Sequence, residues 1–151
     1  MKPHPHFEDW NIPKIHSLGS VNLASLTIHD LERDFSAILD SAEAIKAANP
    51  GMSWPDGLTR EQNLIDLAWH QREFESSRSF AWVIEDRSSE YLGCLYVYPS
   101  ISGDNTADVR WWWRTGIDVD EREFRENLLR WLNGPGWPNL DFLLPVSQSK
   151  E

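Results

Sequence analysis

Apolar residues follow two different spacings along the chain. Alternation of apolar and other side chains, typical of half-buried strands, marks segments such as 106–113. Repeats every three or four residues, typical of amphipathic helices, mark segments such as 31–45, which Asn49-Pro50-Gly51 ends. The pattern predicts strands at 21–26, 80–85, 91–98, 106–113 and 140–144, and helices at about 31–45, 60–75 and 119–133.

The first twenty residues carry three prolines and no periodic apolar pattern. We therefore expect residues 1–20 to form an extended arm over the surface of a single domain that spans 21–151. His4 and His6 could suggest a metal site, but a polar tail is the favoured interpretation because no carboxylate set accompanies them. No metal site is expected.

The spacing also assigns faces to two elements. In the helix at 60–75, the expected inward residues are Leu64, Leu67 and Ala68, and Phe74 continues the stripe less regularly. In the strand at 106–113, one face carries Ala107, Val109, Trp111 and Trp113, and the opposite face carries Asp108, Arg110 and Trp112.

The order of elements predicts an α/β (α+β) fold. Three consecutive strands favour an antiparallel meander, and the following strand–helix–strand unit favours a parallel pair. We expect a mixed, mostly antiparallel sheet flanked by helices, in a domain that ends soon after its last strand. Ligands favour the carboxyl end of a strand that leads into a crossover helix, here 112–116.

Charge and cysteine content exclude several classes of protein. The formal net charge of −10 opposes nucleic-acid binding, which relies on Lys and Arg to neutralise phosphates. No apolar run approaches about 20 residues, so no membrane span is expected, and without a signal-like start a cytoplasmic location follows by default. The lone Cys94 rules out an internal disulfide and is expected to be a buried structural residue. A sheet edge left uncovered near the last strand would favour a homodimer.

Aromatic and charged side chains offer candidate chemistry on the predicted strands. Trp112 lies between Arg110 and Arg114 on the polar face of its strand, which suits an anionic ligand, whereas packing of sheet against helices is the alternative for the tryptophans. Asp108 is a candidate general base, with simple pairing to Arg110 or to solvent as the favoured alternative. The candidate pocket-lining residues are Trp54, Tyr96, Tyr98 and Arg110.

The phrases DLERDFSAILDS (30–41), LGCLYVYP (92–99) and VRWWWRTG (109–116) resemble a bacterial branch of the GNAT superfamily of acyl-CoA N-acyltransferases. The resemblance runs from about residue 23 to residue 145. It implies acetyl-CoA-dependent N-acetylation of a small amine. It also implies that the strand and the turn after it hold the cofactor, through Trp112, Trp113, Arg114, Thr115, Gly116 and Ile117.

The turn itself departs from the pattern of the superfamily. The usual phosphate-binding turn is rich in glycine, but 114–119 contains only Gly116. Acidic residues at 118, 120, 121 and 123 follow it, which suits a helix N-terminus but repels a diphosphate. Two functions therefore stay open: an acyl-CoA-dependent N-acetyltransferase, or a GNAT-like module that binds a ligand or partner without catalysis.

Overall fold

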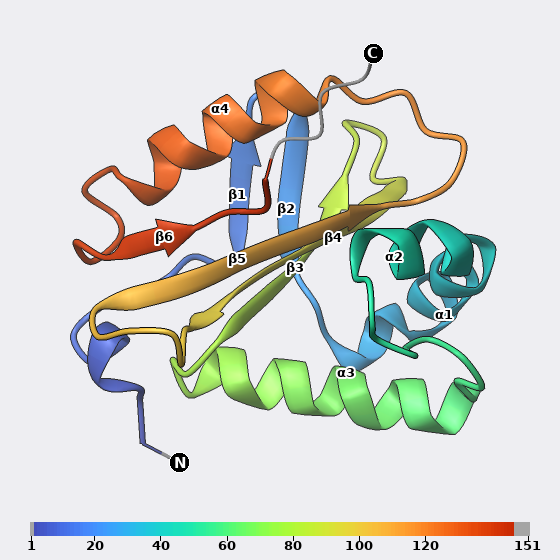
Figure 1. Ribbon diagram of the computed structural model, residues 1–151, viewed down its shortest axis with the longest axis horizontal. Helices are drawn as coiled ribbons and strands as arrows, with labels where there is room; N and C mark the ends of the chain where they lie inside the picture. Colours follow the sequence, from blue (N-terminus) through green and yellow to red (C-terminus); the bar gives the residue numbers. More distant parts are fainter. Residues whose placement is uncertain (1, 147–151) are drawn as a thin grey trace.

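A computed structural model describes residues 2–146 of the chain (Figure 1). This part folds into a six-stranded sheet in the order β1-β2-β3-β4-β5-β6. Every neighbouring pair is antiparallel except β5 and β6, which run parallel. The expected mixed, mostly antiparallel sheet is confirmed. The strands are β1 Ile15–Leu18, β2 Val21–Ser25, β3 Phe80–Glu85, β4 Tyr91–Pro99, β5 Thr106–Trp113 and β6 Asp141–Leu143, and the helices are α1 Leu31–Asp40, α2 Ala42–Ala48, α3 Arg60–Glu75 and α4 Glu121–Leu132.

The helices form a layer on each face of the sheet (Figure 1). α4 covers one face, where Phe124, Leu128 and Leu132 pack with alternate strand residues such as Val109. α1, α2 and α3 cover the other face, where Trp112 packs among buried residues of the helices. The face assignment of β5 is confirmed, because Ala107 and Val109 join the first core and Trp112 joins the second.

The first eighteen residues contribute more to the fold than the sequence pattern indicates. Ile15–Leu18 forms β1, which pairs with β2 at the edge of the sheet. Phe7 and Ile12 are buried in the core on the α4 side of the sheet, and Phe7 stacks edge-on against Phe80 at 4.9 Å between ring centroids. These isolated apolar side chains lack a period, so their burial is visible only once the sheet supplies a surface for them.

The helix expected at 31–45 is divided in two at Ser41, between α1 and α2. Ser41 is fully buried, and its Oγ accepts the backbone N–H of Thr115 at 3.0 Å. Apolar spacing continues across the division, which is why the sequence predicts one helix. The hydrogen bond from Thr115, which lies 74 positions later in the chain, is made at the residue where the helix is interrupted.

The inward face of α3 differs from the expected one. Leu67 is buried as expected, but Leu64 is 39% exposed and Ala68 also faces solvent. The expectation for these two residues was wrong. The buried side is instead formed by Asn63, Leu67 and Phe74. Hydrophobic spacing misses this face because a hydrogen-bonded amide occupies one of its inward positions.

Gly93 lies at an irregularity between β3 and β4. Ile84 pairs with Gly93 and Glu85 pairs with Tyr91, so Leu92 is an extra residue on β4, as in a β-bulge. A Cβ at position 93 would meet the carbonyl oxygen of Trp112 at 2.1 Å. Glycine is therefore required where β4 approaches β5.

We expect Gly93→Ala to destabilise the fold by about 1–3 kcal/mol, because a backbone carbonyl must move to admit the methyl group. Gly136→Ala is the matched control, since an added Cβ there meets nothing within 4 Å. Urea unfolding of the two variants and the parent measures the effect. Equal stability of all three proteins would contradict the steric interpretation of the bulge.

Among residues 2–146, no helix combines the length and apolar character needed to cross a membrane. Within the same range, no group of three or more His, Cys, Asp or Glu side chains could hold a metal ion.

Candidate functional site

A cavity of about 250 Å³ lies between the helices α1 and α3 and the strands β4 and β5. Its walls combine aromatic rings with a small number of polar groups, which is typical of small-molecule sites. Trp54, Tyr96, Tyr98 and Arg110, the four residues expected to line a pocket, all line this cavity. Trp112 lines it too, although the resemblance assigned this residue to the cofactor. The remaining lining residues are Leu26, Asp34, Ile38, Asn49, Met52, Asn63, Asp66, Leu67, His70 and Trp111.

The aromatic wall is held by a hydrogen bond between neighbouring strands. Trp112 Nε1 on β5 donates to the Tyr96 hydroxyl on β4 at 3.0 Å. Trp112 is only 5% exposed, and burial raises the pKa of Tyr96 well above its usual range. The Tyr96 phenol is therefore neutral at physiological pH, and its fixed ring presents an apolar face to the cavity.

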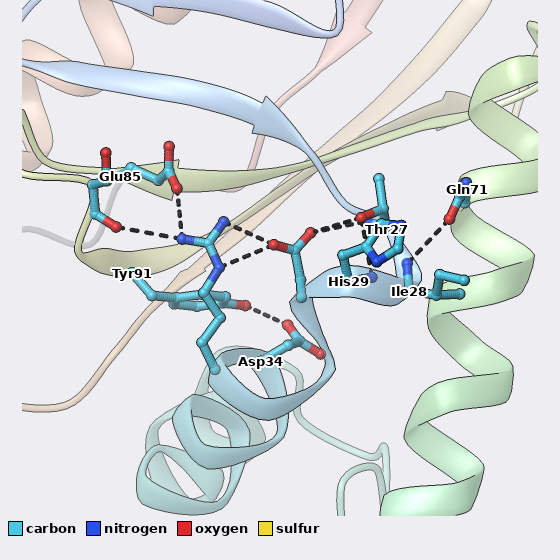
Figure 2. A network of polar contacts seen from close by, with 10 residues as sticks. Thr27, Ile28, His29, Asp34, Gln71, Glu85 and Tyr91 are labelled. Atoms are coloured by element: carbon cyan, nitrogen blue, oxygen red, sulfur yellow. Dashed lines mark hydrogen bonds and ion pairs between the residues drawn. The ribbon is translucent and has the colours of Figure 1, made fainter.

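Asp34 brings a carboxylate to the wall formed by α1. It is 3% exposed and accepts a hydrogen bond from the Tyr91 hydroxyl at 2.5 Å (Figure 2). Its other oxygen accepts a hydrogen bond from Asn63 Nδ2 at 3.0 Å. Burial raises the pKa of Asp34, while these two hydrogen bonds oppose the rise. The two donors come from β4 and α3, so the carboxylate is fixed by three elements of the fold.

Arg33, the cationic residue next to Asp34 in the sequence, pairs with other carboxylates. Arg33 Nε donates to Asp30 Oδ1 at 3.0 Å, and Arg33 Nη1 donates to Glu85 Oε2 at 2.5 Å. Throughout residues 2–146, no Lys, Arg or His side chain forms an ion pair with Asp34. The cavity therefore contains a buried carboxylate whose hydrogen-bond donors are neutral.

α3 contributes two further titratable groups, Asp66 at an exposed position and His70 at a largely buried one. Burial lowers the pKa of His70 to about 4, so its imidazole is neutral at pH 7. Partial desolvation raises the pKa of Asp66. Among the described residues that line the cavity, Arg110 is the one cationic side chain, and its Nη1 donates to Leu143 O at 3.0 Å.

The sequence pattern does not indicate the polar residues Asp34, Asn63, Asp66 and His70 as site residues. Each lies in a helix, where isolated polar side chains are normally solvent-exposed. The available signal was spacing: residues 63, 66, 67 and 70 share one side of α3. That signal is weak until the helix is known to cover a strand that carries tyrosines and tryptophans.

The second half of β5 has an open edge. β5 pairs with β6 only from Thr106 to Asp108, whereas pairing with β4 continues to Trp113. The Arg114 N–H donates to Leu92 O at 2.7 Å, so alternation along an antiparallel ladder directs the backbone groups of Trp111 and Trp113 to the open edge. Arg110 Nη1 reaches Leu143 O at 3.0 Å across the start of this opening.

The turn between β5 and α4 is tied to the junction of α1 and α2. Arg114 Nη2 lies 2.8 Å from Asp40 Oδ2, and the Thr115 N–H donates to Ser41 Oγ at 3.0 Å. Gly116 has a φ of +85°, which favours glycine. Ile117 packs against the core on the α4 side of the sheet. The Arg114 guanidinium and the Thr115 N–H would both suit an anion, but they already have partners within the protein, Asp40 and Ser41.

A carboxylate of the chain itself occupies the N-terminus of α4. Trp111 Nε1 donates to Glu121 Oε1 at 2.9 Å, and Trp113 Nε1 donates to Glu121 Oε2. Asp120 caps the helix by accepting the Glu123 N–H at 3.0 Å. The indoles of Trp111 and Trp113 are thus hydrogen-bonded to the first residue of α4. Trp113, which the resemblance assigns to the cofactor, therefore faces the open edge of β5 with its backbone and not with its side chain.

Asp108 lies on the same face of β5 as Arg110 and Trp112 but outside the lining of the cavity. Its Oδ1 is 3.9 Å from Arg110 Nη2, at the long end of ion-pair distances. The geometry brings Asp108 together with Arg110 but not with Asp34 or His70.

Solved acetyltransferase structures share this fold, although no protein-family model and no curated protein matches the sequence. The ribosomal L7/L12 alpha-N-protein acetyltransferase RimL matches with a TM-score of 0.63 and 11% identity over 78% of this chain and 64% of that chain. The microcin C7 self-immunity acetyltransferase MccE, solved with acetyl-CoA and AMP, matches with a TM-score of 0.62 and 12% identity over 83% of this chain and 68% of that chain. The ribosomal-protein-S5-alanine acetyltransferase from Vibrio fischeri matches with a TM-score of 0.62 and 10% identity over 79% of this chain and 67% of that chain.

The match thus spans less than two thirds of the RimL chain, and at these identities the likeness concerns the fold. GNAT-family and GCN5-related acetyltransferases recur among the similar structures. The chain has the GNAT fold, the fold of acyl-CoA N-acyltransferases.

Proposed function

We propose that this protein is an acyl-CoA-dependent N-acyltransferase that acetylates a small amine bound in the cavity between α1, α3, β4 and β5. The observation that carries the proposal is the buried Asp34 carboxylate, which has neutral donors on two sides and an aromatic cavity in front of it. A buried charge is costly unless an opposite charge or strong hydrogen bonds compensate it. An ammonium group of a ligand would supply that charge.

The rest of the cavity suits the same class of ligand. Trp54, Tyr96 and Trp112 present aromatic rings, which attract cations through their π faces. Asp66 adds a carboxylate at an exposed position, and His70 is neutral at pH 7 because burial lowers its pKa to about 4, so it does not repel a cation. The formal net charge of −10 further favours attraction of a cation from solution.

Acylation of an ammonium group requires removal of a proton before the nitrogen can attack. Burial raises the pKa of Asp34, which makes this carboxylate a better proton acceptor than a surface aspartate. Asp34 would therefore hold the ammonium group and accept its proton. Asp108, the candidate base from the sequence, would act through Arg110, which it approaches at 3.9 Å.

The open edge of β5 fits the arm of the cofactor. Bound acetyl-CoA would supply the thioester carbonyl that the amine attacks. The backbone groups of Trp111 and Trp113 that face the open edge are suited to the amide groups of a pantetheine arm. Trp111 also lines the cavity, so the open edge and the amine site meet at one residue.

The β5–α4 turn fits the diphosphate less well. Arg114 can exchange Asp40 for a phosphate at little cost, because both members of this pair are partly exposed. The carboxylates of Asp118, Asp120, Glu121 and Glu123 oppose a second anion at the helix start. We therefore expect weak affinity for acetyl-CoA, with Arg114 as its main cationic contact.

The test measures release of free CoA thiol from acetyl-CoA in the presence of benzylamine, phenethylamine or cyclohexylamine, with benzyl alcohol as the uncharged comparison. Cys94 is buried and contributes little thiol background. Amine-dependent release is the expected result. Binding of an amine without release at millimolar acetyl-CoA would favour the alternative function, a non-catalytic GNAT-fold module that binds small cations.

Arg114→Ala should weaken acetyl-CoA binding by about three- to tenfold, the range for one partly exposed contact between a guanidinium and a phosphate. Its stability should stay within about 1 kcal/mol of the parent, because the pair with Asp40 lies at the surface. Arg122→Ala is the control, since Arg122 is 89% exposed and pairs only with Glu126 of the same helix. Equal affinities for both variants would remove Arg114 from the cofactor site.

A further inference from the structure

α3 presents a second apolar face that points away from the protein. Ile65 is 67% exposed, Trp69 is 54% exposed and Leu64 is 39% exposed, and Ala68 lies between them at the surface. The opposite side of the helix carries its buried residues, Asn63, Leu67 and Phe74. α3 forms the outer border of the molecule, with no other element beyond it (Figure 1). Exposed contiguous apolar faces of this kind mark interaction surfaces.

Charges of opposite sign stand at the two ends of this outer face. Glu61 lies one turn before Ile65 and Arg72 lies one turn after Ala68, and both side chains are exposed. Neither forms an ion pair with another residue in the part of the chain that the structure describes. The face is therefore an apolar stripe with a negative and a positive end.

This stripe is complementary to itself when two copies of α3 meet antiparallel. A twofold axis midway between Asp66 and Leu67 places Glu61 opposite the partner's Arg72 and Arg72 opposite the partner's Glu61. The same axis places Ile65 opposite the partner's Ala68. Residues 64 and 69 are about 140° apart around the helix, so Leu64 and Trp69 lie on opposite flanks of the contact. A large side chain thus meets a small one at the centre. Twofold contacts of this isologous kind are the commonest in homodimers.

We propose that the outer face of α3 is a homodimer interface and that its occupant is a second copy of this chain. The paired positions favour a second copy over an unrelated partner, because one helix supplies both charges at matching distances from the axis. The Trp69 ring packs at 5.1 Å from His70, which limits its freedom before association. Tryptophans in interfaces commonly carry much of the binding energy. This surface lies outside the amine site and does not depend on the proposed activity.

Two such acidic proteins repel each other, so the two Glu61–Arg72 contacts must act against a net charge of −10 on each copy. Arg72→Glu replaces both contacts with like-charge pairs and should raise the dimer dissociation constant at least about tenfold. Glu61→Arg should do the same. The double variant Glu61→Arg, Arg72→Glu restores opposite charges across the axis and should recover the parent constant to within about threefold.

Sedimentation equilibrium of the full chain from about 1 to about 100 μM measures these constants, since dimer formation depends on concentration by mass action. The expected result is a dimer whose single charge variants dissociate and whose double variant re-forms. Trp69→Ala, which leaves the charges intact, should also dissociate it. Circular dichroism verifies that each variant is folded. A monomeric parent at all concentrations, or a double variant as weak as the single ones, would overturn the proposal.

Discussion

Lowering the pH from 7 to 4.5 should destabilise the fold by about 2–3 kcal/mol through His70 alone. Burial among α3, Tyr96 and the cavity wall lowers the pKa of this imidazole from 6.5 to about 4. The unfolded chain then binds a proton between pH 6.5 and 4 that the folded chain does not. The contribution of His70 is complete above pH 6.5 and is lost as the pH falls towards 4.

His70→Gln isolates this contribution when the free energy of unfolding in urea is compared at pH 7 and pH 4.5. The variant should lose about 2–3 kcal/mol less than the parent between these conditions, whatever its stability at pH 7. The difference matters because other groups also titrate: burial lowers the pKa of His16 in the same direction, while the raised pKa of Asp34 acts in the opposite sense. His29→Gln, at an exposed position, is the control and should lose as much as the parent.

An equal loss in His70→Gln and the parent would mean that water reaches the imidazole through the cavity. That outcome would also weaken the functional proposal, because a charged imidazole in the same cavity as Asp34 would repel an ammonium ligand. The pH dependence of stability therefore tests the electrostatics of the site without knowledge of the substrate.

The strands could be predicted closely from the sequence, and particular residues explain why. β3 and β5 have the predicted bounds, because polar and glycine-containing turns flank runs of β-branched and aromatic side chains. β1 could not be predicted, because Ile15 is 77% exposed and Leu18 is the one buried residue in this edge strand. Such a short strand depends on backbone pairing with β2, which leaves no apolar period in the sequence.

The aromatic half of the site followed from the sequence, and the charged half did not. Tyr96, Tyr98 and Arg110 alternate on neighbouring strands, so one face of the sheet carries all three. Asp34 is surrounded in the sequence by Asp30, Glu32 and Arg33, which makes it resemble a surface charge of a helix. Its donors are 29 and 57 positions away, and only the packing of α1 against α3 and β4 brings them together.

The start of α4 illustrates a second limit of sequence reasoning. Acidic residues there stabilise the helix dipole, and their sequence positions predict only repulsion of a diphosphate. The structure adds that Glu121 accepts both neighbouring indole N–H groups. Its carboxylate thus has a structural role in joining β5 to α4. The acidic turn is consequently part of the fold rather than a simple loss of a binding motif.

Asp34→Asn should lower the affinity for a bound amine at least about tenfold, because it removes a buried charge-assisted contact that is worth about 1.5–3 kcal/mol. Benzylamine is a suitable probe, with its dissociation constant measured by calorimetry. Asp66→Asn is the matched control, since it makes the same change at an exposed position of the cavity wall, where an ion pair is worth about 1 kcal/mol or less. We expect about a two- to fivefold loss for this variant.

Stability and affinity should separate in Asp34→Asn, and this separation distinguishes a ligand-binding role from a structural one. Burial raises the pKa of Asp34, so the carboxylate form is disfavoured in the folded protein when no ligand cation is bound. An amide of the same shape removes that cost, keeps the bond from Asn63 and can donate to the Tyr91 hydroxyl, so unfolding free energy should fall by less than about 1 kcal/mol or rise. A purely structural carboxylate predicts the reverse, a large loss of stability with unchanged affinity for benzylamine. The ratio of the two effects in one variant therefore decides whether Asp34 is kept for the fold or for an ammonium ligand.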